Sequence, residues 1–280
     1  MVKLAVRDVT YSFEIAGSGE KRPLLLLHGF TGSSRNWEPV LPELAARFMV
    51  IAVDLLGHGR SAAPTRPARY MIEAAAADLI DLLDQLAIEQ TSLLGYSMGG
   101  RLALYLAAQY PQRFQALILE SASPGLKEKA EQIERRQRDN ELAARLEREG
   151  LEAFVDYWES LPLWASQEQL AEEVRAGLRR LRLQNDPVGL ANSLRGMGTG
   201  AQPSQWNRLS KLRLPVLLLA GELDSKFVAI NQEMARLIPG AWLEIVPEAG
   251  HTVHLERPSR YAKLVRAFLD FSTKSDPRQK

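Results

Sequence analysis

Short apolar runs alternate with segments of helical spacing along the first 121 residues. Residues 23–29, 48–54, 91–97 and 115–121 are rich in aliphatic side chains, as parallel strands buried on both faces usually are. Between the second and third runs, residues 71–88 repeat apolar positions at the spacing of an amphipathic helix. Strands and helices that alternate in this way predict a doubly wound α/β fold with a mostly parallel sheet.

The pattern changes after this region and later returns. Charge-rich helical stretches without a strand-like run replace it, and strand patterns resume at 214–224 and 241–251, before a closing helix at 260–272. We therefore predict a helical cap inserted into an α/β core. The predicted divisions are the first part of the core at 1–123, the cap at 124–208, the second part of the core at 209–272, and a flexible tail at 273–280.

The composition is typical of a globular chain with no overall preference for anionic polymers. The 280 residues are 46% hydrophobic and 25% charged, and 35 Lys and Arg nearly balance 34 Asp and Glu. We expect neither a nucleic acid nor an anionic membrane as a partner. Residues 1–13 alternate like a strand and have no signal-peptide core, and no run is long enough to span a bilayer. The absence of cysteine excludes a disulfide scaffold, a thiol nucleophile and a cysteine metal site, and we expect a cytoplasmic protein.

Three residue types associated with nucleophilic catalysis follow predicted strands. Ser97 lies in the segment Gly95-Tyr96-Ser97-Met98-Gly99, a G-x-S-x-G nucleophile elbow. Asp224 and His251 follow two later strands, in the chain order Ser, Asp, His of the α/β-hydrolase fold. Asp224 alone could be a turn residue and His251 alone a loop histidine. Together, at the carboxyl ends of parallel strands, they predict a catalytic triad.

Two backbone amides could complete this site. The segment His28-Gly29 leads from the first buried strand into a loop, so the Phe30 amide can point towards the serine, and Met98 offers a second amide. Two such donors form an oxyanion hole, which stabilises a carbonyl oxygen that gains negative charge. The segment DLLGHGRSAAP is a further loop that contains His58 and Ser61, and we predict structural roles for His58 and His254.

Arg101 is unusual beside a hydrolase elbow. It lies four residues after Ser97, and on a helix that begins at the elbow this spacing returns its side chain to nearly the same face. A guanidinium makes paired hydrogen bonds to a carboxylate and keeps its charge, unlike a more flexible lysine. Arg101 therefore indicates an anionic ligand above the serine.

The motifs together resemble two nested families. The segments HGFTG, DLLGHGRS, GYSMGG, GELD and AGH resemble the α/β-hydrolase superfamily, with Leu56 at a position where proline is common. A narrower set is similar to the 2-succinyl-6-hydroxy-2,4-cyclohexadiene-1-carboxylate (SHCHC) synthases of menaquinone and phylloquinone biosynthesis. It comprises GYSMGGRLAL, SASPGLKEKAEQIERRQRD, Trp158 with LPLW, LRLQND, GTGAQPSQW, GELDSKF and AGHTVHLE.

The narrower resemblance implies a reaction and a substrate. These enzymes eliminate pyruvate from 2-succinyl-5-enolpyruvyl-6-hydroxy-3-cyclohexene-1-carboxylate (SEPHCHC), a tricarboxylate that needs several fixed cations. By resemblance, the substrate-binding residues would be Arg101, Arg135 and Arg182, with Tyr96 and Trp158 lining the pocket. On sequence alone Arg135 is otherwise an ordinary arginine of a mixed-charge surface.

We hypothesise that Ser97, activated by His251 and Asp224, removes a ring proton next to the succinyl ketone. The oxyanion hole would hold the enolate, and no metal or organic cofactor is needed for a proton transfer next to a carbonyl. The main alternative is a carboxylic ester or carbon-carbon bond hydrolase with Ser97 as nucleophile. A ligand-binding receptor and a structural scaffold are further alternatives, and the sequence leaves the oligomeric state and the choice between the two quinone pathways open.

Overall fold

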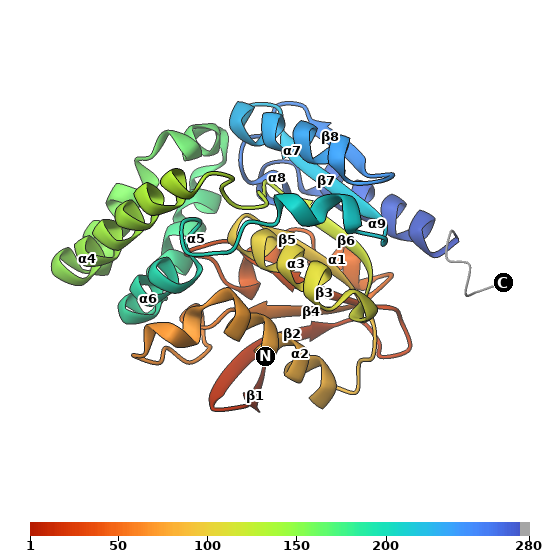
Figure 1. The fold of residues 1–280 in the computed structure, drawn as a ribbon, viewed down its shortest axis with the longest axis horizontal. Coiled ribbons are helices and arrows are strands. Elements are labelled where there is room, and N and C mark those ends of the chain that lie inside the picture. Colours follow the sequence, from red (N-terminus) through yellow and green to blue (C-terminus); the bar gives the residue numbers. More distant parts are fainter. Residues whose placement is uncertain (275–280) are drawn as a thin grey trace.

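A sheet of eight strands forms the centre of the computed structural model, which describes residues 1–274 (Figure 1). The strands are β1 (Val2–Val6), β2 (Val9–Ala16), β3 (Pro23–Leu27), β4 (Met49–Asp54), β5 (Thr91–Tyr96), β6 (Phe114–Glu120), β7 (Val216–Gly221) and β8 (Trp242–Val246). Their order across the sheet is β1-β2-β4-β3-β5-β6-β7-β8. The pairs β1 with β2 and β2 with β4 are antiparallel, and all other pairs are parallel. The predicted mostly parallel α/β sheet is confirmed.

Helices connect the strands and cover the sheet. The α-helices are α1 (Leu41–Ala45), α2 (Ile72–Gln85), α3 (Met98–Gln109), α4 (Lys129–Glu159), α5 (Glu172–Arg182), α6 (Pro187–Met197), α7 (Ser225–Leu237), α8 (Val253–Glu256) and α9 (Pro258–Lys274). Short 3₁₀ helices are η1 (Ser34–Trp37), η2 (Pro67–Tyr70), η3 (Pro111–Arg113), η4 (Pro162–Gln169) and η5 (Trp206–Lys211). The helices predicted at 71–88 and 260–272 correspond to α2 and α9, and α3 begins directly after the predicted elbow at Ser97.

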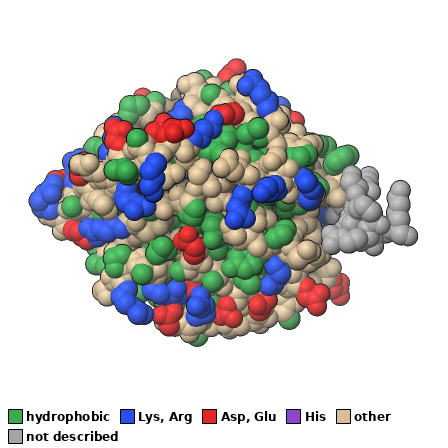
Figure 2. Space-filling view, in the orientation of Figure 1, with side chains coloured by type: hydrophobic (Ala, Val, Ile, Leu, Met, Phe, Trp, Pro, Cys, Tyr) green, Lys and Arg blue, Asp and Glu red, His purple; other side chains and the backbone are tan. Residues whose placement is uncertain are grey.

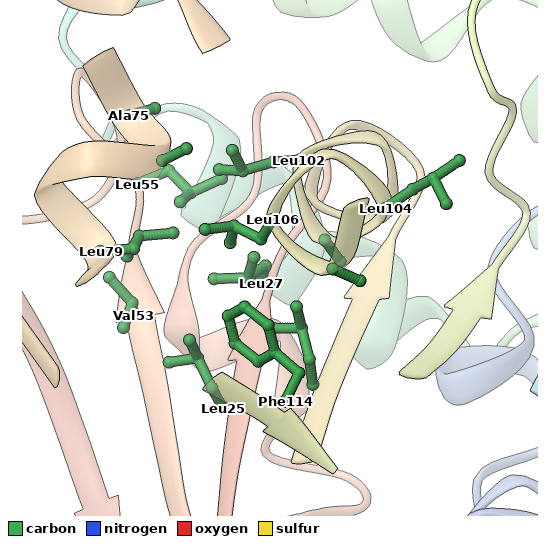
Figure 3. Close-up of a cluster of buried hydrophobic side chains, with 14 of the residues drawn as sticks. Leu25, Leu27, Val53, Leu55, Ala75, Leu79, Leu102, Leu104, Leu106 and Phe114 are labelled. Atoms are coloured by element: carbon green, nitrogen blue, oxygen red, sulfur yellow. The ribbon is translucent and has the colours of Figure 1, made fainter. Parts of the chain in front are cut away.

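Both faces of the sheet are buried, which explains its continuous apolar strands. In β3, Leu25 and Leu27 pack into a cluster with side chains of α2 and α3, whereas Leu24 and Leu26 pack on the opposite face with side chains of α1 and α9. Figure 3 shows the first cluster, in which Leu79 of α2 lies near Leu25 and Leu27 of the sheet. Full burial of such a side chain contributes about 1.5–3 kcal/mol relative to exposure. Successive side chains of a strand point to opposite faces of the sheet. Because both faces are covered here, neither set of side chains faces solvent, and both sets are apolar.

The segment between β6 and β7 folds into helices only. It contains α4, η4, α5, α6 and η5, and Figure 1 shows α4, α5 and α6 gathered on one side of the molecule. Gly150, with φ of 83°, interrupts the helical geometry of α4. A small apolar cluster joins α4 to α6, with Phe154 and Leu190 fully buried in it. The exact division into core and cap at 123/124 and 208/209 stays a prediction.

The strand patterns at 214–224 and 241–251 each contain a strand and the loop that follows it. The strands β7 and β8 end at Gly221 and Val246, and the following residues form connecting loops that carry Asp224 and His251. The two loops bind each other, since the amides of Glu222 and Leu223 donate to the carbonyls of Val246 and Ala249. The single strand pattern at 1–13 is a hairpin of β1 and β2. Most of the predicted flexible tail at 273–280 lies outside the described residues.

Charges of both signs are interspersed on the surface. Figure 2 shows Lys, Arg, Asp and Glu side chains mixed over the visible face and no histidine on it, and all four histidines of the chain are buried. Within residues 1–274, no helix combines the length and apolar character needed to cross a membrane.

Candidate active site

The elbow that carries Ser97 is a sharp turn between β5 and α3. Ser97 has φ of 50° and ψ of −109°, a conformation that non-glycine residues rarely adopt and that costs of order 1–3 kcal/mol. The turn requires a small neighbour, because a Cβ atom on Gly99 would lie 2.2 Å from the Leu27 carbonyl oxygen. The amide of Ser97 donates to the Glu120 carbonyl at 2.8 Å. The fold therefore holds the serine at the carboxyl end of the central strands.

Ser97, His251 and Asp224 lie in one hydrogen-bonded row. His251 Nε2 is 3.1 Å from Ser97 Oγ, and His251 Nδ1 is 2.6 Å from Asp224 Oδ2. The imidazole is 2% exposed, and the other Asp224 oxygen accepts the Phe227 amide at the start of α7. An imidazole that donates Nδ1–H to this carboxylate presents its Nε2 lone pair to the serine hydroxyl. His251 can therefore take the hydroxyl proton of Ser97, and the serine oxygen can then accept a proton from a ligand.

The loop after β3 fixes the direction of the Phe30 amide. The Leu55 amide donates to His28 Nε2, which leaves the proton on Nδ1, and Nδ1 lies 2.7 Å from the Gly29 carbonyl oxygen. Burial lowers the pKa of His28 to about 4, so the ring stays neutral in this role. Because a trans peptide directs its C=O and N–H to opposite sides, the Phe30 amide points away from His28.

Met98 supplies the second amide. It is the first residue of α3, where an amide has no acceptor within its own helix and lies at the positive end of the helix dipole. Phe30 and Met98 line the same cavity of about 220 Å³ as Ser97 and His251. The two predicted oxyanion-hole residues are therefore brought together beside the serine.

Arg101 lines this cavity as a partly buried cation whose side chain donates to neutral groups. Its Nη1 donates to the Met197 carbonyl at 2.8 Å and to the side-chain oxygen of Gln202. Burial lowers the pKa of Arg101 to about 10, with a smaller contribution from the nearby charge of Arg135. No ion pair of Arg101 occurs among the described residues. The cavity thus contains a positive charge that an anionic ligand could neutralise.

Arg135 reaches the same cavity from the helical segment. Its Nε donates to Asp139 Oδ1 at 2.8 Å, and its side chain is 41% exposed. Asp139 is 5% exposed and its second oxygen is buried without a hydrogen-bond partner. The sequence analysis missed Asp139, although its spacing of four residues from Arg135 on a helix predicts such a pair.

Sequence comparisons agree with this geometry. A family model described as alpha/beta hydrolase fold matches residues 22–258. A Bacillus subtilis protein, provisionally named 2-succinyl-6-hydroxy-2,4-cyclohexadiene-1-carboxylate synthase, is 48% identical over 96% of this chain and 98% of its own length. A Salmonella paratyphi B protein of that name is 35% identical over 84% of this chain and 89% of its own.

This chain belongs to the SHCHC synthase family of α/β-hydrolases. A solved structure described as MenH from S. aureus is similar throughout. It has a TM-score of 0.89 and 38% sequence identity, and the match covers 94% of this chain and 98% of that one. The resemblance and the fold stated from the motifs are confirmed.

The remaining residues that SHCHC synthase motifs indicate occupy two different places. Trp158 lines the cavity, with its ring 5.2 Å from that of Phe30. Tyr96 also lines it, but its hydroxyl is 3.0 Å from Thr252 Oγ1 on the core side. Arg182 is not among the lining residues, because its guanidinium binds Glu159 at 2.7 Å.

Trp164 separates Arg182 from the relay. The Arg182 guanidinium lies 5.4 Å from the centre of the Trp164 ring, and that ring lies 5.6 Å from the His251 ring. Trp164 lines the cavity and was not singled out from the sequence, although the LPLW segment that contains it was. An SHCHC synthase substrate in this cavity would contact Trp164 before it reached Arg182.

His58 and His254, which were predicted to be structural, make contacts of that kind. His58 lies 3.1 Å from the Leu56 carbonyl oxygen, and in the same loop the Ser61 hydroxyl donates to the Asp54 carbonyl. His254 is fully buried against both carboxylate oxygens of Glu120. Across residues 1–274, no group of three His, Asp or Glu side chains is arranged to hold a metal ion.

Proposed function

We propose that this chain eliminates pyruvate from SEPHCHC to form SHCHC, as the names of its relatives indicate. The observation that carries the proposal is the placement of Arg101. Among the described residues, a partly buried guanidinium that hydrogen-bonds through its side chain only to neutral groups shares one cavity with an assembled Ser97, His251 and Asp224 relay. A simple ester hydrolase needs the relay and has no use for the buried charge.

The relay removes the ring proton next to the succinyl ketone. Ser97 Oγ accepts this proton as its own proton moves to His251 Nε2, and Asp224 stabilises the imidazolium that forms. The Phe30 and Met98 amides stabilise the enolate oxygen, and one such donor contributes about 3 kcal/mol in comparable enzymes. Ser97 acts as a base and forms no bond to carbon.

Elimination then follows from the enolate. Its electrons move through the ring double bond and break the bond between the ring carbon and the enolpyruvyl oxygen. The departing enolate of pyruvate takes up a proton, and the ring is left as a conjugated cyclohexadiene. The reaction is redox-neutral and combines proton transfer with the cleavage of one carbon–oxygen bond, so it needs no redox cofactor.

Two cations hold the tricarboxylate in register with the relay. Arg101 and Arg135 line the cavity and are the direct candidates for carboxylate binding, while Trp158 and Tyr96 form part of its wall. In this structure Arg182 contacts the Trp164 ring and not the cavity, so it would affect substrate binding by positioning that ring. Positioning of this kind supplies a large part of enzymatic rate enhancement.

The alternative is a carboxylic ester or carbon-carbon bond hydrolase. The same relay and amides would serve it, with Ser97 attacking a carbonyl carbon and water completing the reaction. Aryl ester hydrolysis that is faster than SEPHCHC elimination, and that an Arg101→Ala variant retains in full, would support this alternative.

Incubation of the purified protein with SEPHCHC tests the proposal. We expect pyruvate, measured with a coupled dehydrogenase, and diene absorbance to appear at equal rates. A Ser97→Ala variant serves as the control for spontaneous elimination. If neither signal exceeds that control, the proposed function is wrong.

A further inference from the structure

Gln202 makes an unusual contact with Arg101. It lies in the loop between α6 and η5, is 2% exposed, and its side-chain oxygen accepts a hydrogen bond from Arg101 Nη1. The loop belongs to the GTGAQPSQW segment, to which the proposed reaction assigns no role. The second acceptor of Nη1, the Met197 carbonyl, immediately precedes this loop.

Both acceptors are neutral, and this determines what Arg101 can do. An arginine that is largely removed from water is commonly paired with a carboxylate, which cancels its charge. An amide oxygen instead fixes the guanidinium plane and leaves the charge available. The nearby Asp139 already binds Arg135 Nε at 2.8 Å.

The hydrogen bonds also determine which edge of Arg101 is available. Among the described residues, its side-chain bonds to Met197 and Gln202 both come from Nη1, which has two protons. The Nε and Nη2 edge therefore remains for paired hydrogen bonds to a carboxylate in the cavity.

The same loop packs against the helix that carries Arg135. A Cβ atom on Gly200 would lie 2.4 Å from the Arg136 amide nitrogen and 2.9 Å from the Arg135 carbonyl carbon. The close approach places the loop directly on the backbone of α4. One loop thus touches both cations of the cavity, Arg101 through a side chain and Arg135 through the main chain.

We propose that Gln202 is a positioning residue that makes the site specific for anionic substrates, because it orients Arg101 without neutralising it. The inference rests on the proposed anionic substrate and deepens it. A glutamate of the same length would keep the contact and cancel the charge. The choice between an amide and a carboxylate at position 202 therefore sets the charge preference of the cavity.

Gln202→Glu tests this in the full chain. We expect KM for SEPHCHC to rise about tenfold or more while kcat changes less than about threefold, because the glutamate cancels the Arg101 charge that attracts a substrate carboxylate. Gln137→Glu is the matched control, since it adds the same charge on the exposed side of α4 and should leave KM within about twofold. An unchanged KM in Gln202→Glu overturns the proposal. A fall in kcat as large as the rise in KM, together with a lowered Tm, also overturns it, because a general loss of folding then explains the effect.

Succinate binding separates this inference from the proposed reaction, because calorimetric titration needs no turnover. We expect the wild type to bind succinate and Gln202→Glu to bind it at least about tenfold more weakly. Equal Kd values, or no binding by the wild type, overturn the inference whether or not pyruvate is released. If Gln202→Glu does not fold, Gln202→Leu replaces it, with an expected loss of about threefold or more, and an unchanged Kd has the same meaning.

Discussion

The two sides of the cavity are built in different ways. On the core side, Ser97, His251 and Asp224 lie in loops that end parallel strands. They bind one another, and Ser97 and Asp224 are held by further hydrogen bonds. On the cap side, Arg135 is partly exposed and held by one residue of its own helix. Such helical pairs contribute only about 0.3–0.5 kcal/mol. The core side is rigid enough to position catalytic groups, and the cap side is suited to substrate recognition.

Arg101 joins the two sides. It belongs to α3 on the core side, yet both of its hydrogen-bond partners, Met197 and Gln202, come from the segment between β6 and β7. Changes to the relay should therefore abolish turnover on any substrate, whereas changes to the cations should affect anionic substrates selectively. The following changes test this difference, from the largest expected effect to the smallest.

Replacement of the base should have the largest effect. Ser97→Ala removes the oxygen that lies 3.1 Å from His251 Nε2, and general acid–base groups typically contribute 10²–10⁴-fold. We expect kcat for SEPHCHC to fall about 10³-fold, with KM little changed because the cations remain. Steady-state pyruvate release measures both constants. A large rise in KM with preserved kcat would contradict the division between the two sides.

Acid should destabilise the core side through His28. Burial lowers its pKa to about 4, whereas an unfolded histidine titrates near 6.5, so between these values the unfolded chain binds an extra proton. The free energy of unfolding should therefore fall by about 3 kcal/mol from this group as the pH decreases from 6.5 to 4. Urea titrations at several pH values measure this slope.

His58 has a pKa lowered to about 3 by burial and changes stability in the same direction. The wild type must therefore be compared with His28→Gln, which keeps His58. We expect a shallower loss of stability in the variant between pH 6.5 and 4. Parallel curves would show that His28 is not buried as a neutral ring.

Removal of the Arg101 charge should affect recognition. Arg101→Met keeps much of the buried volume but leaves the Met197 carbonyl and the Gln202 oxygen without their donor. Hydrogen bonds to charged groups contribute about 1.5–3 kcal/mol, so kcat/KM for SEPHCHC should fall about 10–100-fold. Equal losses in SEPHCHC elimination and in any hydrolysis of a neutral aryl ester would contradict a role in anion recognition.

Arg135→Gln should have the smallest effect, because its side chain is 41% exposed and partly screened by Asp139. We expect KM for SEPHCHC to rise about threefold to tenfold. Arg138→Gln is a close control, since Arg138 forms the same kind of pair with Glu134 but is 68% exposed and outside the cavity lining. If both variants have the same KM, Arg135 has no specific role.

The sequence allowed the core side to be predicted well, because its pattern is local. The positions of Ser97, Asp224 and His251 follow from strand ends, and parallel strands bring their carboxyl ends to one edge. The segments 214–224 and 241–251 named for these strands include the loops that carry Asp224 and His251, and the structure shows that β7 and β8 end at Gly221 and Val246. The catalytic roles of these residues stay predictions.

The cap side was less predictable, because its contacts join distant parts of the chain. Gln202 lies 101 positions from Arg101, and no spacing rule connects them. Arg182 matches the family motif, yet here it binds Glu159 and Trp164 rather than lining the cavity. Asp139 was the one omission that helical spacing could have indicated.

A single-turnover experiment tests the central claim that Ser97 is a base in a pyruvate-eliminating enzyme. Excess protein is mixed with SEPHCHC, quenched at successive times, and analysed for pyruvate and for intact protein mass. We predict one pyruvate for each substrate consumed, with the protein mass unchanged at every time. A substrate-derived adduct on Ser97 that forms and decays at the rate of turnover, or consumption of substrate without pyruvate, would contradict the account.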